Sequence, residues 1–229
     1  MRVLVFDTET TGLPKTKILN PDTLNEWPNV VQFSYIIYDV SCNEIVNWRD
    51  NIIKVPESII ISEDSVKIHG ITNEISANAG IPIEDALNNF FHCLKDIELI
   101  VGHNISFDIN MVKVELLRII YNKSLNAKQL KEHKHNLNII TNFDIYCTLK
   151  ESIQLCKIQA FDKKGRSYFK YPKLIELHEK LFNVSPRNLH NSFNDILVTL
   201  RCFIKIKHCS DLLETCETFK TIANKICLL

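Results

Sequence analysis

The stretch R-V-L-V-F-D-T-E-T-T-G-L, residues 2–13, decides the fold. It opens with a short apolar run, Arg2–Phe6, which is followed by Asp7 and a turn-like T-E-T-T-G-L-P sequence. Such a run predicts a strand buried in the centre of a sheet. Because side chains two residues apart in a strand point to the same face, Asp7 and Glu9 are expected to project together from its end.

Two carboxylates this close repel one another, and burial would raise the pKa of either group. A divalent cation relieves both effects, and ligation by oxygen alone suits Mg²⁺ or Mn²⁺. The competing interpretation is a strand end that carries two solvated acids. This stretch alone does not decide between the two.

The elements that follow predict an α/β fold. Two β-rich runs, Val30–Val40 and Glu44–Ile53, are separated by three residues typical of a hairpin, so an antiparallel meander opens the fold. Further along, a brief apolar strand is expected at 98–102, and helices are expected at 62–68, 82–95, 105–121, 147–157, 174–182, 192–207 and 211–227. This order predicts a central mixed sheet, an antiparallel meander plus parallel strands, flanked by helices.

Two polar stretches are expected to be irregular. Residues 122–138, rich in Lys and Asn, are the best candidate for a mobile insertion, and 137–140 could be a short strand or a helix end. Residues 159–171 predict a loop. Residues 162–173 are the best candidate for a groove that holds a substrate strand, and a plain solvated loop is an equally good interpretation of their basic and aromatic residues, Lys163, Lys164, Arg166, Tyr168, Phe169, Lys170, Tyr171 and Lys173.

Length and charge bound the function. A chain of 229 residues suits one compact domain, and its formal net charge is +0 with a pI of about 7.1. Binders of nucleic acid are usually basic, which argues against a large footprint on a duplex. An enzyme that grips a few nucleotides remains compatible, since metal ions can supply positive charge.

The eight cysteines form no CxxC pair, which disfavours a zinc site. No secretory signal opens the chain and no apolar run reaches the roughly 18 residues of a membrane span. We therefore expect reduced, mostly buried thiols in an intracellular protein of a reducing compartment, the cytoplasm or, for a viral protein, the host cell.

A second acidic site is V-G-H-N-I-S-F-D, residues 101–108. Asp108 follows an apolar strand and a Gly-His-Asn turn, and it lies at the start of a predicted helix. The helix dipole would stabilise a carboxylate there, which also explains the acid without any function. Asn104 could equally be the N-cap of that helix.

The third site is H-N-S-F-N-D, residues 190–195. Ser192 and Asp195 could simply form a capping box. His190 would then lie in the loop just before the helix, from which it can swing over whatever Asp195 coordinates. An exposed histidine with a pKa near neutrality suits a general base.

Together the three sites supply four carboxylates and one histidine at the ends of predicted buried elements. This is the inventory of a two-metal hydrolase, in which ions about 3.5–4 Å apart clamp the attacking and leaving oxygens. One ion would lower the pKa of the attacking water and the histidine would take its proton. The joint pattern favours phosphodiester hydrolysis over the three separate structural explanations.

The chain closely resembles the histidine-containing (DEDDh) subgroup of the DnaQ-like exonuclease superfamily, which includes the epsilon-type proofreading exonucleases. The resemblance spans residues 3–203 in the family's order. It rests on D-T-E-T-T-G-L at 7–13, W-P-N-V-V-Q-F at 27–33, H-G-I-T at 69–72, V-G-H-N-x-x-F-D at 101–108, Y-C-T-L at 146–149, P-K-L-x-x-L at 172–177 and H-x-x-x-x-D at 190–195.

The resemblance implies a ribonuclease-H-like fold and a role for each matching acid. Asp7 would bridge two Mg²⁺ ions, for which Mn²⁺ can substitute. Glu9 and Asp195 would hold the ion that activates the water, and Asp108 would support the second ion. His190 would be the general base.

The resemblance also implies a nucleotide pocket. The terminal nucleotide would be held by Thr10, Thr11, Gly12 and Leu13, with Leu13 wedged against its base. The same pocket would be lined by His103, Asn104 and Phe107. We expect His69, in H-G-I-T, to be a structural helix end rather than a catalytic residue.

The function expected is 3′→5′ exonuclease activity that releases nucleoside monophosphates from single-stranded or frayed 3′ ends. DNA is favoured over RNA, and a DNA polymerase is the expected partner if the chain proofreads in trans. The exonuclease domain would cover residues 1–209, with a C-terminal helix, 210–229, packed on the same domain. The alternatives are a non-catalytic module that binds nucleic acid or protein, and a phosphodiesterase for short oligonucleotides.

Overall fold

The structure is a computed structural model that describes residues 1–122 and 124–228. Its strands are β1 (Arg2–Thr10), β2 (Val30–Asp39), β3 (Glu44–Ile52), β4 (Leu99–Gly102), β5 (Ile145–Cys147), β6 (Gln159–Phe161) and β7 (Ser167–Phe169). Its α-helices are α1 (Glu63–His69), α2 (Asn73–Ala79), α3 (Ile83–Cys93), α4 (Ser106–Asn122), α5 (Ala127–Asn142), α6 (Thr148–Glu151), α7 (Ile153–Cys156), α8 (Leu174–Phe182), α9 (Ser192–His208), α10 (Leu212–Thr215) and α11 (Glu217–Lys225). Two 3₁₀ helices are η1 (Pro21–Glu26) and η2 (Leu94–Asp96).

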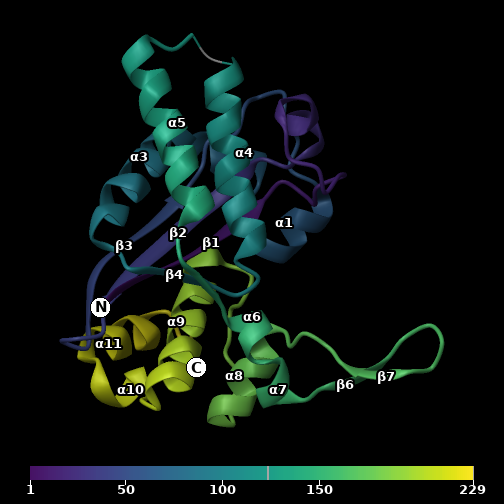
Figure 1. Cartoon of the computed structure of the whole chain (residues 1–229), viewed down its shortest axis with the longest axis vertical. Coiled ribbons are helices and arrows are strands. Elements are labelled where there is room, and N and C mark those ends of the chain that lie inside the picture. Colours follow the sequence, from purple (N-terminus) through teal and green to yellow (C-terminus); the bar gives the residue numbers. More distant parts are fainter. Residues whose placement is uncertain (123, 229) are drawn as a thin grey trace.

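The first five strands form one mixed sheet in the order β3-β2-β1-β4-β5. The β1–β2 and β2–β3 pairs are antiparallel, and the β1–β4 and β4–β5 pairs are parallel. Helices cover both faces, with α3, α4 and α5 on one side and α9, α10 and α11 on the other (Figure 1). The predicted fold class, a meander plus parallel strands flanked by helices, is confirmed.

The strand β1 divides its side chains between two cores. Leu4 and Phe6 pack with residues of α3 and α4, whereas Val3 and Val5 pack with residues of α9. Because successive side chains of a strand point to opposite faces, the same division applies to the residues that follow in β1. Asp7 and Glu9 therefore lie on the α9 side, while Thr8 and Thr10 face α4.

The pairing of β1 with β4 is short. It covers only Val3–Val5 on β1, whereas β1 pairs with β2 along its whole length. The last residues of β1 therefore extend beyond β4, and their backbone groups on that edge are open to side chains rather than to a strand. This edge is where the candidate site lies.

The stretch 122–138 is not an irregular insertion. From Ala127 the chain forms the 16-residue helix α5, which also contains 137–140 and packs beside α4. Asn126 starts it with a capping box to Gln129, and its buried residues are His133, Asn136 and Ile140. Their three- and four-residue spacing marks a helix face that the Lys- and Asn-rich composition conceals. Lys123 lies outside the described residues.

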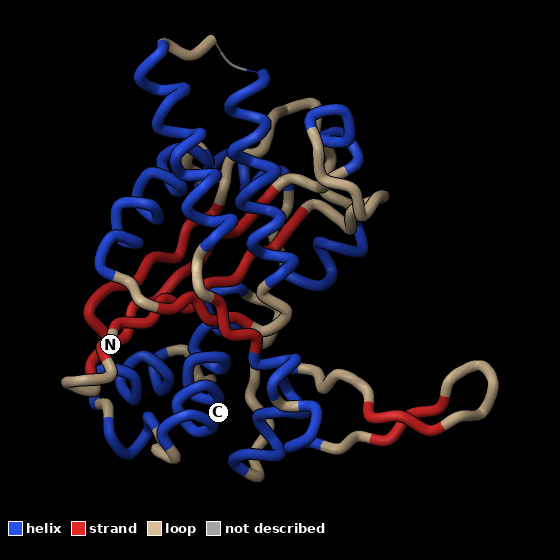
Figure 2. The backbone as a smooth tube through the Cα atoms, in the orientation of Figure 1, coloured by secondary structure: helices blue, strands red, loops and turns tan. Residues whose placement is uncertain are grey.

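Other differences concern short elements. The predicted loop 159–171 contains the antiparallel hairpin β6–β7, which projects from the body of the molecule (Figure 2). The predicted helix 147–157 is instead the end of β5 followed by two single turns, α6 and α7. The helix α2 was not expected, because its seven residues carry too few apolar positions to show a period.

The C-terminal segment is two helices rather than the single predicted one. Cys216 has an extended backbone and its Sγ accepts a hydrogen bond from the Phe219 amide, so it ends α10 and caps α11. Leu212, Phe219 and Ala223 of this segment are buried in the core that α9 shares. Leu229 lies outside the described residues.

None of the described helices is long and apolar enough to cross a membrane. All eight cysteines are free. The expectation that most are buried is wrong, since only Cys147, Cys202 and Cys216 are buried. The others lie at helix ends and turns, where sequence periodicity does not report exposure.

A buried polar network joins α8, α9 and α10. The Arg201 guanidinium makes two hydrogen bonds to the Asp211 carboxylate, at 2.8 and 2.7 Å, and lies 3.8 Å from the centre of the Phe182 ring. It also donates to His178 Nε2 at 2.9 Å, while His178 Nδ1 donates to the Val184 carbonyl. Arg201 is thus buried with its charge fully matched.

Asp211→Ala should lower the free energy of unfolding by about 3–5 kcal/mol, because it leaves the Arg201 charge buried and unpaired. Urea or guanidinium denaturation measures the loss. The matched control is Asp64→Ala, which removes the exposed ion pair with Lys67 and should cost less than about 1 kcal/mol. Equal losses in the two variants would contradict the role given to Asp211.

Candidate active site

Three of the predicted acids meet at the end of β1. Carboxylate oxygens of Asp7, Glu9 and Asp195 all lie within 4.8 Å of one another. Asp7 and Glu9 come from β1, and Asp195 comes from the first turn of α9. The structure thus brings Glu9 and Asp195 together, although they are 186 positions apart in the chain.

Polar contacts with β2 fix the start of α9 above these acids. In the sheet, Asp7 pairs with Ser34 and Glu9 pairs with Gln32. The Ser192 amide donates to Gln32 Oε1 at 3.1 Å, and the Ser192 and Ser34 hydroxyls are hydrogen-bonded. The register of β1 and β2 therefore carries the α9 N-terminus to the two acids.

Asp50 of β3 completes this anchor. Its Oδ1 accepts hydrogen bonds at 2.8 Å from both Gln32 Nε2 and Ser34 Oγ. Because the Ser34 hydroxyl proton is used there, the Ser192 hydroxyl is the donor to Ser34. Sequence reasoning missed this network, since only three strands in register make its members neighbours.

The capping-box interpretation of the third site is wrong. The N-cap of α9 is Asn191, whose side chain accepts from the amides of Phe193 and Asn194. Ser192 is the first helical residue and contacts β2 instead. Asp195 is thereby left free of a capping role, and its carboxylate faces Asp7 and Glu9.

Asp108 approaches the same strand from α4. Its Oδ1 accepts the Thr8 amide at 2.9 Å and the Thr8 hydroxyl at 2.8 Å. The Thr8 amide is available because β1 extends beyond its pairing with β4. Asp108 is 3% exposed, so its carboxylate is held rigidly beside the three-acid cluster.

His190 lies beside Asp195 but outside the acid cluster. Its backbone has a φ of 67°, a left-handed conformation uncommon for residues with a side chain. Its amide donates to Asp195 Oδ1 at 3.3 Å, and the residue is exposed. The backbone is therefore tied to a cluster acid while the imidazole remains accessible to solvent.

Burial raises the pKa of all four carboxyl groups. The Glu9 pKa rises to about 8 through burial and the Asp195 and Asp108 charges, and that of Asp195 rises to about 7. Burial raises the Asp108 pKa to about 7 even though Thr8 donates two hydrogen bonds to it. For Asp7, burial and the charges of its three acidic neighbours hold the pKa well above its usual range.

The residues fit a divalent cation. The donors are carboxylate oxygens only, which is the set that hard cations prefer. Four acids with raised pKa values also need a positive charge if they are to ionise together. Asp7, Glu9 and Asp195 are close enough to share one ion, and Asp108 is near enough for its charge to act on Asp7 and Glu9.

The loop after β1 lies next to this cluster and is braced from two sides. The Thr11 amide donates to the Asn29 carbonyl at 2.9 Å, and the Asn29 amide donates to the Thr11 hydroxyl at 3.0 Å. His69 Nδ1 accepts from the Ile71 amide, so its Nε2 carries the proton and donates to the Thr10 carbonyl. His69 therefore acts structurally, as expected.

The end of this loop is open. Leu13 is 84% exposed, and a Cβ atom added at Gly12 would meet nothing within 4 Å. Thr11, Gly12 and Leu13 line a cavity of about 830 Å³ together with Trp27 and Ser62. By contrast, the Thr10 hydroxyl donates to the Gly12 carbonyl at 2.7 Å and so shapes the loop from within.

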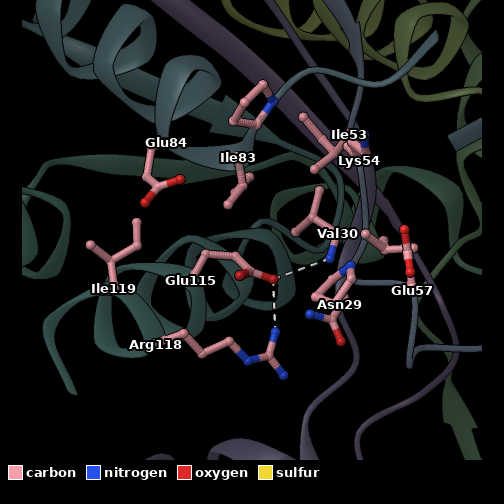
Figure 3. A pocket seen from close by; sticks show the side chains of 13 residues that line it. Asn29, Val30, Ile53, Lys54, Glu57, Ile83, Glu84, Glu115, Arg118 and Ile119 are labelled. Carbon is pink, nitrogen blue, oxygen red and sulfur yellow. Dashed lines mark hydrogen bonds and ion pairs between the residues drawn. The ribbon is translucent and has the colours of Figure 1, made fainter. Parts of the chain in front are cut away.

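Arg118, which also lines this cavity, belongs to a largely buried ion pair. Arg118 contacts Glu115 at 2.8 Å and also donates to the carbonyls of Leu24, Trp27 and Pro28. Glu115 accepts the Val30 amide as well, as Figure 3 shows beside a neighbouring cavity of about 490 Å³. These contacts fix the segment that carries Asn29. In the sequence these contacts are marked only by an acid and a base three residues apart.

The other predicted pocket residues lie between β4 and α4. His103 Nε2 donates to the Pro172 carbonyl at 3.1 Å, and its Nδ1 accepts from the Thr148 hydroxyl at 2.9 Å. Burial lowers the His103 pKa to about 4, so the ring is neutral and fully engaged with protein. Asn104 is exposed in a left-handed turn, and Phe107 is half-buried.

The fold and the acid cluster define the class of protein. A family model described as Exonuclease (RNase_T) matches residues 4–203, and the chain belongs to this family. It is a member of the DnaQ-like group, as its motifs predicted. Among curated proteins it is similar to the epsilon subunit of DNA polymerase III.

The epsilon subunit of Buchnera aphidicola subsp. Schizaphis graminum is 30% identical over 148 residues, which cover 63% of this chain and 54% of that protein. That of Pasteurella multocida is 25% identical over 199 residues, covering 85% and 63%. The chain thus spans about half the length of the curated relatives it matches.

Solved structures show the same fold. Escherichia coli exonuclease I in complex with a dA16 oligonucleotide has a TM-score of 0.59 at 17% identity, covering 91% of this chain and 41% of that one. Exonuclease I from Methylocaldum szegediense has a TM-score of 0.56 at 14% identity, covering 93% and 42%.

The raised carboxyl pKa values make metal-free stability depend on pH. Between about pH 6.5 and 8 the unfolded acids are already ionised, whereas folded Glu9, Asp108 and Asp195 still lose protons. The folded state binds more protons in this window, so its stability should fall as pH rises. Mg²⁺ should raise the Tm more at pH 8 than at pH 6, since protons compete for the same oxygens.

Thermal unfolding in EDTA and in Mg²⁺ across this window measures both effects. Asp7→Asn, which removes one charge from the cluster, should flatten the pH slope and weaken the response to Mg²⁺. The matched control, Asp22→Asn on the exposed end of η1, should behave as wild type. A metal-free Tm that rises between pH 6.5 and 8 would contradict the electrostatics described here.

Proposed function

We propose that the chain is a two-metal 3′→5′ exonuclease of the histidine-containing (DEDDh) subgroup. The observation that carries the proposal is the convergence of Asp7, Glu9 and Asp195 within 4.8 Å, with Asp108 beside them. Family membership over residues 4–203 supports it independently.

The four acids would hold two Mg²⁺ ions, for which Mn²⁺ can substitute. Asp7 is close enough to the other three acids to feel the charge of each, and it would contact both ions. Glu9 and Asp195 would hold one ion, and Asp108 would support the other. When bound, the ions neutralise the phosphodiester and make the attacking water more acidic. The rigid hold of Thr8 on Asp108 supports this arrangement, because it sets one ligand before any ion arrives.

His190 would accept the proton of the attacking water. Its amide is tied to Asp195, and its ring is exposed in the loop before α9. A general base must be within reach of water yet able to release the proton to solvent, and this position meets both requirements.

The terminal nucleotide would bind against the loop after β1. Leu13 offers an exposed apolar side chain for its base, and the open space at Gly12 allows close backbone approach. Thr11, Asn104 and Phe107 would contribute to the same pocket. Thr10 and His103 would support its walls through their hydrogen bonds to Gly12, Thr148 and Pro172. A pocket that holds only the terminal nucleotide would lead to the release of one nucleoside monophosphate per cycle.

Single-stranded or frayed DNA is the proposed substrate, with RNA the second choice. The similar epsilon subunits belong to a DNA polymerase, and the similar exonuclease I structure holds a dA16 oligonucleotide. Proofreading in trans for a DNA polymerase is the corresponding cellular role.

Digestion of 5′-labelled single-stranded DNA and RNA of equal sequence tests the activity. With Mg²⁺ or Mn²⁺ we expect a ladder of products one nucleotide apart, and none in EDTA or with Asp7→Ala. A matched control is Asp22→Ala, which should keep full activity. If the folded, metal-binding protein cuts neither polymer, the proposal fails and a non-catalytic binding module or a short-oligonucleotide phosphodiesterase replaces it.

His190→Ala should lower kcat by about 10²–10⁴-fold, the usual contribution of a positioned base. KM and the Mg²⁺-induced rise in Tm should change little, since the acids remain. His135→Ala, an exposed histidine on α5, serves as the control. A loss of less than tenfold in kcat for His190→Ala would rule out its role as the base.

A further inference from the structure

A hairpin arm, residues 157–173, projects from the body of the molecule. It consists of β6, β7 and their flanking residues, and it extends away from the sheet at the end where α6, α7 and α8 lie (Figures 1 and 2). A two-stranded hairpin standing alone in water is only marginally stable. An arm of this kind gains order when it binds a partner.

The arm concentrates positive charge in a chain whose formal net charge is +0. Six of its seventeen residues are Lys or Arg, and its one acid is Asp162. Asp162 is used by the arm itself, in an ion pair with Arg166 at 2.7 Å. Lys163 and Lys164 form no ion pair with any described residue, so the tip carries free positive charge.

The tip is a built turn rather than a loose loop. Asp162 Oδ1 accepts the amides of Lys164 and Arg166, at 2.8 and 2.9 Å. The Asp162 carbonyl accepts the amide of Gly165, whose φ of 76° favours glycine. This closure presents Lys163 and Lys164 together at the end of the arm.

Exposed aromatic side chains follow the lysines down the arm. Phe161, Tyr168, Phe169 and Tyr171 are 66, 51, 44 and 57% exposed. Phe161 pairs with Ser167, and Phe169 pairs with Gln159, so the two phenylalanines share one face of the ribbon at diagonal positions. Four exposed aromatics on so short a segment are unfavourable in water unless they serve binding.

The base of the arm is joined to the candidate active site. Pro172, at the end of the arm, accepts a hydrogen bond from His103 in the turn that leads to Asp108. Lys170 pairs with Glu176 of α8 at 2.6 Å, which anchors the second strand of the arm. The base of the arm is therefore fixed beside the start of α4, the helix that carries Asp108, whereas the tip of the arm is free.

We propose that this arm binds the single-stranded portion of the nucleic acid upstream of the 3′ nucleotide. The proposal rests on the exonuclease function and extends it to substrate grip. Phosphates match the unpaired lysines, and bases stack on exposed aromatics, the combination that sequence-tolerant single-strand binding uses. An acidic protein surface would match the charges but would leave the aromatics without a matching partner.

The arm reaches far enough to contact several nucleotides. Its strands with the turn extend about 20 Å at roughly 3.3 Å per residue. The tip lysines and the two phenylalanines lie along this length rather than at its base, so a dinucleotide-sized ester held in the active site would not extend to them, whereas a 20-mer would. The arm's contribution should appear only with long substrates.

Three double variants test the arm in the full chain. Lys163→Ala/Lys164→Ala removes the tip charges, Phe161→Ala/Phe169→Ala removes the aromatic face, and Lys131→Ala/Lys134→Ala removes two exposed lysines of α5 as the matched control. One readout is the ratio of kcat/KM for dT20 to that for the p-nitrophenyl ester of thymidine 5′-monophosphate. The other is anisotropy of labelled dT20 in Ca²⁺, which binds such sites but positions water poorly.

The aromatic variant should lower both the kcat/KM ratio and dT20 affinity at least fivefold. The lysine variant should reduce the slope of log affinity against log salt by about 1.4, at about 0.7 for each lost phosphate contact. The α5 variant should match wild type in all readouts.

Wild-type values in both arm variants would overturn the proposal and favour a protein partner for the arm. Failure of the exonuclease function has a different signature. The wild-type chain would then hydrolyse neither substrate, while dT20 binding in Ca²⁺ would still report whether the arm grips a single strand.

Discussion

The mutual repulsion of Asp7, Glu9, Asp108 and Asp195 is the constraint on which the rest of the structure depends. Burial disfavours ionisation of all four groups, and neighbouring acidic charge adds to it for Asp7, Glu9 and Asp108, so the fold must hold the acids in place against their own electrostatics. It does so with hydrogen bonds from uncharged residues that neighbour the acids. Thr8 fixes Asp108 from β1, and β2 fixes the helix that carries Asp195 through Ser192.

The same logic extends to the histidines and the internal ion pairs. His69, His103 and His178 have pKa values lowered by burial, and each has both ring nitrogens hydrogen-bonded, with at least one bond to a segment more than twenty residues away. Arg201 is buried and Arg118 is partly buried, and both have their donors matched to carboxylates and to carbonyls or a histidine. Only His190 among the histidines of the site is exposed and free of such duty, which is consistent with a chemical rather than a structural role.

The neutral net charge of the chain conceals an uneven distribution. The acids gather at the end of β1, where cations would bind, while a surplus of lysines lies on the arm. An average over the sequence therefore argued against a large nucleic-acid footprint. The separation of the acid cluster from the lysines of the arm is compatible with one substrate, whose end would bind the metal ions and whose remaining length would contact the lysines.

The sequence by itself determined four of the five strands of the sheet, all but β5, together with the order of the main helices and the residues proposed for the site. Periodicity and the D-T-E and H-x-x-x-x-D motifs are local, so they survive without coordinates. It did not determine α5, the β6–β7 hairpin or the break at Cys216, because capping and pairing decide those short elements and composition conceals them. Only the tertiary structure decided that Asp195 does not cap α9, that Asp108 accepts hydrogen bonds from the open edge of β1, and that both ring nitrogens of His103 are hydrogen-bonded to other segments. Each of these depends on contacts between residues more than forty positions apart or on which of two adjacent residues caps a helix, and sequence spacing carries no information about either.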